Sequence, residues 1–570
     1  MTGFGPPKKN KTKRINLSHK YIDSGKLISK AIQFHSQGSI LEASKCYQLF
    51  IDKGFKDPRV LINYGVICQQ KGELDKAKLL FQELVELFPQ NPVGFSNLGG
   101  ILKEQGKLNE AEFYLRKAIE LKPDFADAYS NLGTILQDLG KLVEAESLSK
   151  KAIEFNSEDV ISHFNLSIIL KDQGKLIEAE LFARKAIKIN PGYAKAYYAL
   201  GVILKDQGKL IEAELSRSKS IKLNPNYARS YFSISTIKNP SSQNNWQTYL
   251  FSEDILKKQT RLDSIDIYFA RANIMHNQKN YEKSTEFLLL ANKLKLEIYP
   301  SDCAKFIDKS KELITLSNQT KIELSRFNSK KEHIFIVGMP RSGSTLLESI
   351  ITMNPEVNDL GEDNIFEKAF LEWENNPQAL ERSTLSQLYS REVDNIENES
   401  KISTNKWLYN YQYTGIISSQ LANAKIIHCH RNPLDNILSI YRANFASGNK
   451  YSSSLVDSAR VYLDQDQVMT EYKKQYPTKI YDLNYDSLVN KPKHEIRSLI
   501  SWLGWDWNDS YLSPHLNSRS VSTASNVQVR SPINSKSVGG WKYYQKMLKP
   551  AIALINQSER YADLITRKFN

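Results

Sequence analysis

Residues 333–363 read HIFIVGMPRSGSTLLESIITMNPEVNDLGED, and this stretch decides how the C-terminal half of the chain folds. Its residues 334–337 form a short β-branched and aromatic run, which is typical of a buried parallel strand. Small residues around one arginine follow, and apolar residues then recur at helical spacing from Leu346. The order strand, small-residue loop, helix leaves backbone N–H groups and a helix N-terminus facing the loop. Such a loop favours a bound phosphate or sulfonate.

The spacing from Gly338 to Gly343 resembles a nucleotide-triphosphate loop, but one residue differs. That motif has a lysine after its second glycine, where this chain has Ser344. Enzymes of ATP and GTP use the lysine at the terminal phosphates, so ordinary phosphoryl transfer is disfavoured. Arg341 is the only cation in the loop. A donor with a single anionic bridge suits this loop better, and the loop gives no reason to expect a metal ion.

The composition is that of a soluble globular protein with several domains. Of 570 residues, 41% are hydrophobic and 25% charged, so disorder throughout is excluded. The four cysteines are far apart, which predicts reduced thiols. We find no apolar run long enough for a membrane span and no apolar core of a secretory signal. These features predict a cytoplasmic protein.

The net charge of +14 raises the question of nucleic-acid binding. Much of this charge lies in residues 1–24, a basic tail with few acids, and such a run is usually a solvated flexible arm. No aromatic stacking platform or recognition motif accompanies it. We therefore expect no nucleic-acid partner.

The first half of the chain repeats itself with a period of about 34 residues. One column of the repeat consists of Gly65, Gly99, Gly133 and Gly201, with Ser167 in one unit. A second column consists of Gly38, Gly72, Gly106, Gly140, Gly174 and Gly208. The first column lets two antiparallel helices approach closely, and the second lies at the turn between them. A proline closes most units.

These columns resemble the tetratricopeptide repeat, and the match covers about six units. The resemblance implies a helical solenoid whose concave groove holds a protein or peptide partner; a rigid spacer is the alternative. We expect a basic flexible tail at 1–24, the solenoid at 25–238, a degenerate repeat, cap and linker at 239–330, and an α/β domain with a parallel sheet at 331–570. The fold class is therefore multidomain: an all-α solenoid followed by a P-loop-like α/β domain.

The loop itself resembles the 5′-phosphosulfate loop of sulfotransferases that use 3′-phosphoadenosine-5′-phosphosulfate (PAPS). The residues that carry the resemblance are Pro340, Arg341, Ser342, Gly343, Ser344 and Thr345. The family implies that PAPS is the donor substrate and that no metal is needed. Three residues match catalytic positions of the family: Glu362, the base that takes the acceptor proton, and Lys406 and Ser525, which contact the transferring sulfonate.

Further matches lie in three later segments and imply contacts with the donor nucleotide. Arg431 and Ser439 match the family's 3′-phosphate site, and Arg442 lies one turn after Ser439 on the same predicted helix. Tyr485 matches a tyrosine that packs at the nucleotide, and Arg530 lies with Ser525 in a lid-like segment. A zinc site at residues 428–430 is excluded, because side chains alternate along a strand and the cysteine points away from both histidines.

Two departures from the family stand out: Leu408, in the segment of Lys406, and Gly540, where relatives have a basic residue before Trp541. Lys536 or Lys542 would have to supply that cation. We predict a bacterial, repeat-fused sulfotransferase that acts on a hydroxyl of a protein tyrosine, a saccharide or a small molecule. A nucleotide kinase-like enzyme and an inactive repeat scaffold are the alternatives.

Overall fold

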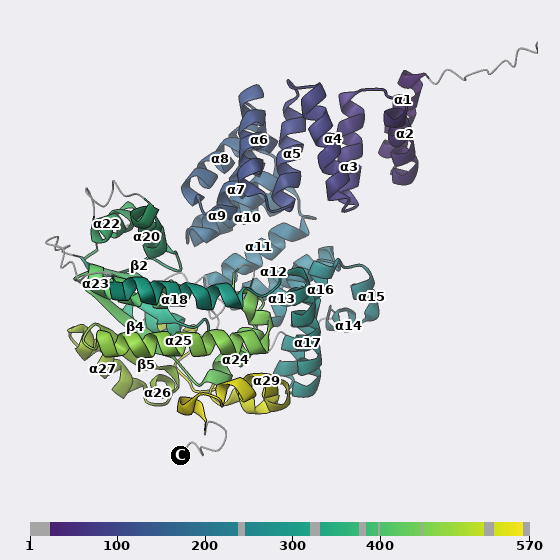
Figure 1. Cartoon of the computed structure of the whole chain (residues 1–570). Helices are drawn as coiled ribbons and strands as arrows, with labels where there is room; N and C mark the ends of the chain where they lie inside the picture. Colours follow the sequence, from purple (N-terminus) through teal and green to yellow (C-terminus); the bar gives the residue numbers. More distant parts are fainter. Residues whose placement is uncertain are drawn as a thin grey trace, which may run out of the picture. The chain divides into compact units, whose positions relative to one another are not determined.

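The computed structural model describes residues 23–237, 246–319, 331–375, 384–396, 400–445, 448–517 and 529–562. The chain divides into two compact units, residues 1–173 and 174–570. Figure 1 shows both units coloured along the sequence. The boundaries predicted at 238 and 330 fall on segments outside the described residues, so the four-part division stays a prediction.

The first unit is built from antiparallel helix pairs. Its helices are α1 (Ser24–Ser36), α2 (Ile40–Asp52), α3 (Pro58–Gln70), α4 (Leu74–Leu87), α5 (Pro92–Glu104), α6 (Leu108–Leu121), α7 (Ala126–Asp138), α8 (Leu142–Phe155) and α9 (Val160–Asp172). Between the helices of each pair lies a glycine of the turn column, with a positive φ of 73° to 78° in Gly38, Gly72, Gly106 and Gly140. Glycine is favoured there because it has no Cβ to oppose this conformation.

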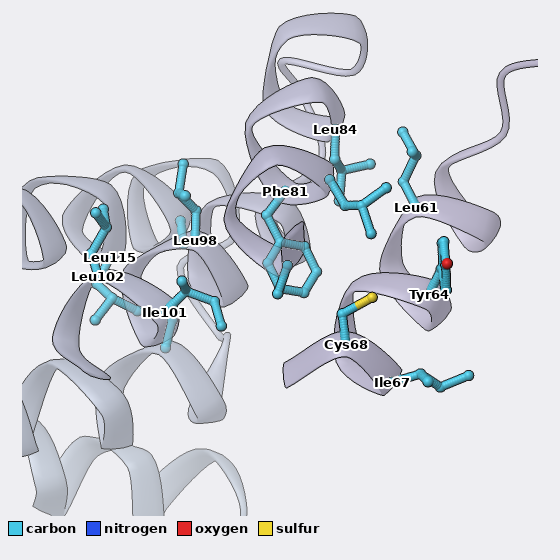
Figure 2. Packing of buried hydrophobic residues seen from close by; sticks show 14 of the residues in the cluster. Leu61, Tyr64, Ile67, Cys68, Phe81, Leu84, Leu98, Ile101, Leu102 and Leu115 are labelled. Carbon is cyan, nitrogen blue, oxygen red and sulfur yellow. The ribbon is translucent and has the colours of Figure 1, made fainter. Parts of the chain in front are cut away.

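The other glycine column allows the two helices of a pair to touch. A Cβ at Gly65 would lie 2.5 Å from the Phe81 ring, and a Cβ at Gly99 would lie 2.8 Å from Leu115. Figure 2 shows Phe81 among the apolar side chains of its neighbours. These contacts belong to one hydrophobic core that runs through the helices of this unit, as stacked repeats require.

The second unit begins with further helices of the array. They are α10 (Leu176–Ile189), α11 (Ala194–Asp206), α12 (Leu210–Leu223) and α13 (Ala228–Ser235). After two short helices, α14 (Trp246–Leu250) and α15 (Glu253–Lys257), the chain forms a long antiparallel pair, α16 (Arg261–Asn277) and α17 (Tyr281–Ile298), and then α18 (Cys303–Gln319). The pair α16–α17 is the helix pair that periodicity predicted in this stretch, and α16 packs on α13.

The rest of the second unit is an α/β fold around a parallel sheet. In the described residues the sheet has five strands: β1 (Glu332–Gly338), β2 (Val357–Asp359), β3 (Ile402–Asn405), β4 (Ala424–His430) and β5 (Ile480–Asn484). Their order is β2-β3-β1-β4-β5, and every neighbouring pair is parallel. The sequence predicts strands at residues 334–337, 425–433 and 479–483, and these are β1, β4 and β5; the short β2 and β3 were not predicted.

Helices cover both faces of the sheet because alternate residues of a strand point to opposite sides. Ile334 and Ile336 of β1 share a core with α19 (Ser344–Ile351), α26 (Tyr485–Asn490) and α27 (Pro492–Leu503). Phe335 and Val337 share the opposite core with α18, α20 (Ile365–Asn375), α22 (Leu385–Ile396), α23 (Thr414–Gln420) and α25 (Leu455–Gln475). Figure 1 shows α18 and α25 side by side over this face, and the two helices are in contact.

A third core lies beside the sheet. It joins α16 and α17 to α24 (Pro433–Tyr441), α25 and α29 (Gln545–Ile555). Short 3₁₀ turns connect the elements: η1 (Leu408–Tyr411), η2 (Lys450–Ser453), η3 (Asp509–Leu512), η4 (Pro514–Leu516), η5 (Gly540–Tyr544) and η6 (Glu559–Tyr561). The predicted fold class, a helical repeat array followed by an α/β domain with a parallel sheet, is confirmed. Within the described ranges, no helix combines the length and apolarity that crossing a bilayer requires.

Candidate active site

Five of the predicted site residues lie just beyond the carboxyl ends of the five strands. Arg341 lies in the loop after β1, Glu362 follows β2, Lys406 directly follows β3, Arg431 directly follows β4, and Tyr485 directly follows β5. The strands are parallel, so these ends meet at one edge of the sheet. In open α/β sheets this edge is where ligands bind.

The loop after β1 packs against β4 and opens into α19. A Cβ at Gly338 would lie 2.2 Å from the carbonyl oxygen of Cys429, so the loop can approach β4 only without a side chain there. Gly343 is the N-cap of α19, with a φ of +103° and no side-chain cap for the first N–H groups of the helix. Ser342 is buried, and its Oγ has no hydrogen-bond partner among the described residues. A helix N-terminus and an unsatisfied hydroxyl are suited to an anion.

Arg341 lies at the centre of a group of positive charges. Its backbone has a φ of +66°, and its Nε donates to Ser439 Oγ at 3.1 Å. Burial, together with the nearby guanidinium groups of Arg431 and Arg442, lowers the pKa of Arg341 to about 10. At neutral pH the side chain still carries its charge, and its neighbours raise the electrostatic gain from binding an anion.

Arg431 lies against the loop and against a tyrosine. Its Nη1 lies 3.5 Å from the carbonyl oxygen of Arg341, and its Nη2 donates to the carbonyl of Ser537 at 2.7 Å. Its guanidinium lies 4.8 Å from the centre of the Tyr485 ring, and this ring also covers Gly343, where a Cβ would lie 2.2 Å from it. The loop and the arginine after β4 therefore border the same place.

Helix α24 supports this place with two residues that were not predicted. Asn436 is buried and donates to the carbonyl of Pro340 in the loop at 3.0 Å. Asp435 accepts from the backbone N–H groups of Gly539 at 2.6 Å and Trp541 at 2.9 Å. Both are polar residues in the first turns of a largely apolar helix, which is the signal that sequence reasoning missed.

Lys406 lies between two carboxylates. Its Nζ is 2.6 Å from Glu362 Oε1 and 3.3 Å from Glu348 Oε2. The side chains of Lys406 and Glu348 are 1% and 2% exposed, whereas that of Glu362 is 48% exposed. One carboxylate therefore holds the ammonium group from the interior and the other faces solvent. Glu348 was not predicted; its signal in the sequence is an acid within the apolar run of the loop helix.

The turn that carries Glu362 is tied to the segment of Lys406. The backbone N–H of Lys406 donates to the carbonyl of Gly361 at 3.0 Å, and Asn405 Nδ2 donates to the carbonyl of Asp363 at 2.9 Å. The Asp363 carboxylate is directed elsewhere, to Lys368 at 2.9 Å. Glu362 is therefore the carboxylate of this turn that meets Lys406.

The remaining predicted residues lie at different places in the structure. Arg442, at the end of α24, is close enough to Arg341 to affect its pKa; its guanidinium lies 5.8 Å from the centre of the Tyr544 ring. Arg530 donates to the carbonyl of Asn517, and the Asn517 side chain contacts the last turn of α19. That turn is the end of α19 away from the loop. Ser525 lies outside the described residues.

The histidines of β4 form a cluster without the neighbouring cysteine. His428 Nδ1 is 2.7 Å and His430 Nε2 is 3.6 Å from Asp482 Oδ1. Cys429 belongs to the core on the opposite face of the sheet. In the part of the chain that the structure describes, no three histidine, cysteine or acidic residues are grouped as metal ligands.

Comparison with known proteins finds similarity in two parts of the chain. Residues 333–509 match the model of the sulfotransferase family. Tetratricopeptide repeat models match residues 58–91, 99–140, 125–158, 161–193 and 182–214. The first match covers all five strands of the sheet, and the others fall on the helix pairs.

One similar protein is an uncharacterized protein of Aquifex aeolicus, 30% identical over 354 residues. The alignment covers 56% of this chain and 46% of the relative, so the chain spans about half the length of that protein. Among solved structures, YrrB, a TPR protein with an unusual peptide-binding site, is 23% identical, with a TM-score of 0.26 over 32% of this chain and 94% of YrrB. A thermophilic TPR protein of Thermus thermophilus is 19% identical, with a TM-score of 0.29 over 32% of this chain and 99% of that protein.

Proposed function

This chain is a tetratricopeptide-repeat protein with a sulfotransferase-family domain, and we propose that it transfers the sulfonate group of PAPS to a hydroxyl acceptor. One observation carries the proposal: the guanidinium of Arg431 lies 3.5 Å from the carbonyl oxygen of Arg341 in the loop after β1. A nucleotide with phosphate groups at both its 5′ and 3′ positions needs two such anion-binding places within its own length.

The residues present fit this donor. The N-terminus of α19 and the unsatisfied Ser342 Oγ would bind the 5′-phosphosulfate, together with Pro340, Gly343, Ser344 and Thr345 of the loop. Arg431 and Ser439 would bind the 3′-phosphate, with Arg442 nearby, because a guanidinium matches phosphate in both charge and geometry. The buried Arg431 Nε has no partner among the described residues, so it can donate to an added anion. Tyr485 would pack against the nucleotide.

Glu362 and Lys406 would serve the acceptor side of the reaction. When bound, PAPS supplies an activated sulfonate, whose sulfur exchanges its bond to the phosphate oxygen for one to the acceptor oxygen. Glu362 accepts the proton of the acceptor hydroxyl, which its partial exposure allows. Lys406 holds a positive charge where negative charge develops on the sulfonate oxygens. Ser525 is proposed to assist there and Arg530 to close over the donor, both from the family resemblance alone.

The arrangement favours a sulfonate over a phosphoryl donor. Transfer of a terminal phosphate relies on a loop lysine and a metal ion to neutralise several charges, whereas Ser344 stands at the lysine position here. A sulfonate carries less charge, so N–H groups and the ammonium of Lys406 can neutralise it. A kinase-like enzyme and an inactive scaffold remain the competing functions.

The acceptor is proposed to be a protein tyrosine, a saccharide or a small molecule that carries a hydroxyl. Tetratricopeptide arrays present extended surfaces suited to a protein or peptide, so the repeats would present the acceptor or a partner protein. We also propose that the enzyme acts in the cytoplasm of a bacterium.

Calorimetric titration of the full chain tests the proposed function. We expect binding of 3′-phosphoadenosine 5′-phosphate (PAP) and weaker binding of ATP. Preference for ATP would favour a kinase, and binding of neither would favour a scaffold. Incubation with PAPS labelled in its sulfonate, together with a cell lysate, would then identify the acceptor as the species that gains the label.

A further inference from the structure

Helix α17, which precedes the transferase fold in the chain, contacts the helix that supports the loop. Asn292 Nδ2 donates to the carbonyl of Tyr441, the last residue of α24, at 3.0 Å. Lys295 Nζ donates to the carbonyl of Phe445 at 2.7 Å and to Asn444 Oδ1 at 3.1 Å, just beyond the same helix end. Asn292 and Lys295 are 1% and 9% exposed.

These contacts suit the chemistry of a helix C-terminus. The last carbonyl groups of a helix have no partner within it, and a cation there also interacts favourably with the helix dipole. Burial lowers the pKa of Lys295 to about 8, and nearby Asp266 opposes that shift. The ammonium group is therefore mostly charged at neutral pH. Lys295, a side chain that is costly to bury, is therefore placed against the segment that follows α24.

The N-terminal part and the middle of α24 border the proposed donor site. Asn436 donates to the loop carbonyl of Pro340, and Ser439 accepts from Arg341. The helix α24 therefore connects α17 to the loop: α17 binds its C-terminal end, and the loop is bound to its middle. The third hydrophobic core packs α16 and α17 against α24.

The connection also continues toward the repeats. Asn273 of α16 donates to Ser235 Oγ of α13 at 3.1 Å, and the rings of Phe232 and Phe269 lie 6.2 Å apart between the same two helices. The pair α16–α17 therefore contacts the last repeat helix on one side and the support of the donor loop on the other.

We propose that Lys295 and Asn292 are positioning residues for donor binding, so that the pair α16–α17 is a working part of the transferase and not a passive linker. The inference rests on the proposed function. These residues do not touch the donor; they act through α24, which sets where Ser439 and Asn436 meet the loop.

The test uses the full chain with Lys295→Met, which keeps the side chain's length and removes its charge. We expect the KM for PAPS and the Kd for PAP to rise about tenfold, with kcat within about twofold of the parent, which is the size of effect seen for residues that couple to a site without touching it. Lys295→Arg should recover most of the affinity. Lys293→Met is the matched control, because Lys293 is exposed on the same helix, and it should bind PAP as the parent does.

Two further measurements separate positioning from loss of folding. If Lys295→Met melts early, Asn292→Leu tests the same helix end without a charge, and it should also raise the Kd for PAP. In a double-mutant cycle with Ser439→Ala, the two effects on Kd should combine less than multiplicatively, because both act through α24. Unchanged KM and Kd in folded Lys295→Met and Asn292→Leu would overturn the inference. Failure of the parent chain itself to bind PAP would instead overturn the proposed function.

Discussion

Lys406 Nζ lies 2.6 Å from Glu362 Oε1, and the same ammonium group lies 3.3 Å from the buried Glu348 Oε2. One cation thus connects a solvent-facing carboxylate to a carboxylate of the loop helix. This relationship joins the ends of β2 and β3 to α19, and it makes distinct predictions for each of the three residues.

Replacing Glu362 by alanine should abolish turnover and leave PAP binding close to the parental value. The reason is that the proposed function gives Glu362 the acceptor proton and no contact with the donor nucleotide. Loss of a general base costs about 10²-fold to 10⁴-fold in kcat. The matched control is Asp363→Asn, because Asp363 pairs with Lys368 on the surface. Parental turnover in Glu362→Ala, with loss in Asp363→Asn, would move the base to Asp363.

Lys406→Met should reduce both stability and turnover, and Glu348 separates the two effects. Removing the lysine breaks a buried ion pair with Glu348, which costs about 3 to 5 kcal/mol of unfolding free energy. Adding Glu348→Gln should restore part of that stability, because a neutral amide is less costly to bury. Turnover should stay low in the double variant, since the cation at the sulfonate is still missing. Thermal melting and kcat measure the two effects; recovery of both together would show that Lys406 has only a structural role.

Arg431→Ala should weaken PAP binding by about 2 to 4 kcal/mol, the loss expected for a charged contact with phosphate. The 5′-monophosphate AMP provides the internal control, because it lacks the 3′-phosphate and should bind the variant and the parent alike. Arg460→Ala, at an arginine with an exposed side chain, controls for net charge. Equal losses for PAP and AMP in calorimetry would place Arg431 away from the 3′-phosphate.

Gly343→Ala should destabilise the chain and weaken PAP binding more than Gly361→Ala does. Both glycines have positive φ, but a Cβ at Gly343 would lie 2.2 Å from Tyr485, while a Cβ at Gly361 would meet nothing within 4 Å. Gly361→Ala should therefore lower the free energy of unfolding only by the cost of holding alanine in a left-handed backbone conformation, about 1 to 2 kcal/mol. In a Tyr485→Ala background, Gly343→Ala should cost less than in the parent. Equal costs in both backgrounds, measured by denaturant unfolding, would show that the ring does not limit this position.

His333 should make the chain less stable in acid. Burial lowers its pKa to about 4, below the value of about 6.5 in an unfolded chain. The unfolded state therefore binds more protons between these values, so stability is complete above pH 6.5 and is lost as the pH falls toward 4. The loss attributable to His333 approaches about 3 kcal/mol at pH 4.

Melting temperatures at pH 7.5 and 4.5 check this expectation. His333→Leu should show a smaller drop between the two pH values than the parent does. His494→Gln, at a histidine whose side chain is 75% exposed, should show the parental drop. An unchanged drop in His333→Leu would mean that other groups carry the acid sensitivity.

Local patterns predicted much of the fold. The runs at β1, β4 and β5 are long and apolar enough to be read as strands, and the glycine columns predicted the helix pairs. Strands β2 and β3 were missed because each has only three or four residues, including polar residues such as Asn358. Their extended backbone depends on pairing with neighbouring strands, which no local pattern records.

The candidate site was predicted unevenly for a similar reason. Motif positions identified Arg341, Glu362, Lys406 and Arg431 one at a time. Glu348 was missed because an acid in an apolar helix indicates no function until its partner is known. That partner, Lys406, follows strand β3. Arg530 was placed with the donor residues by motif order, and only the structure shows that it donates to the carbonyl of Asn517.

By itself the sequence determined the repeat period, the strand-loop-helix at residues 333–351 and the order of the charged residues that follow it. Each of these depends on neighbouring or regularly spaced residues, because backbone preference and apolar spacing act over short range. Only the tertiary structure decided that Lys406 meets Glu348, that Arg431 meets the loop, and that Lys295 binds the segment after α24. Those contacts join residues that are distant in the chain, and packing of whole helices and strands brings them together.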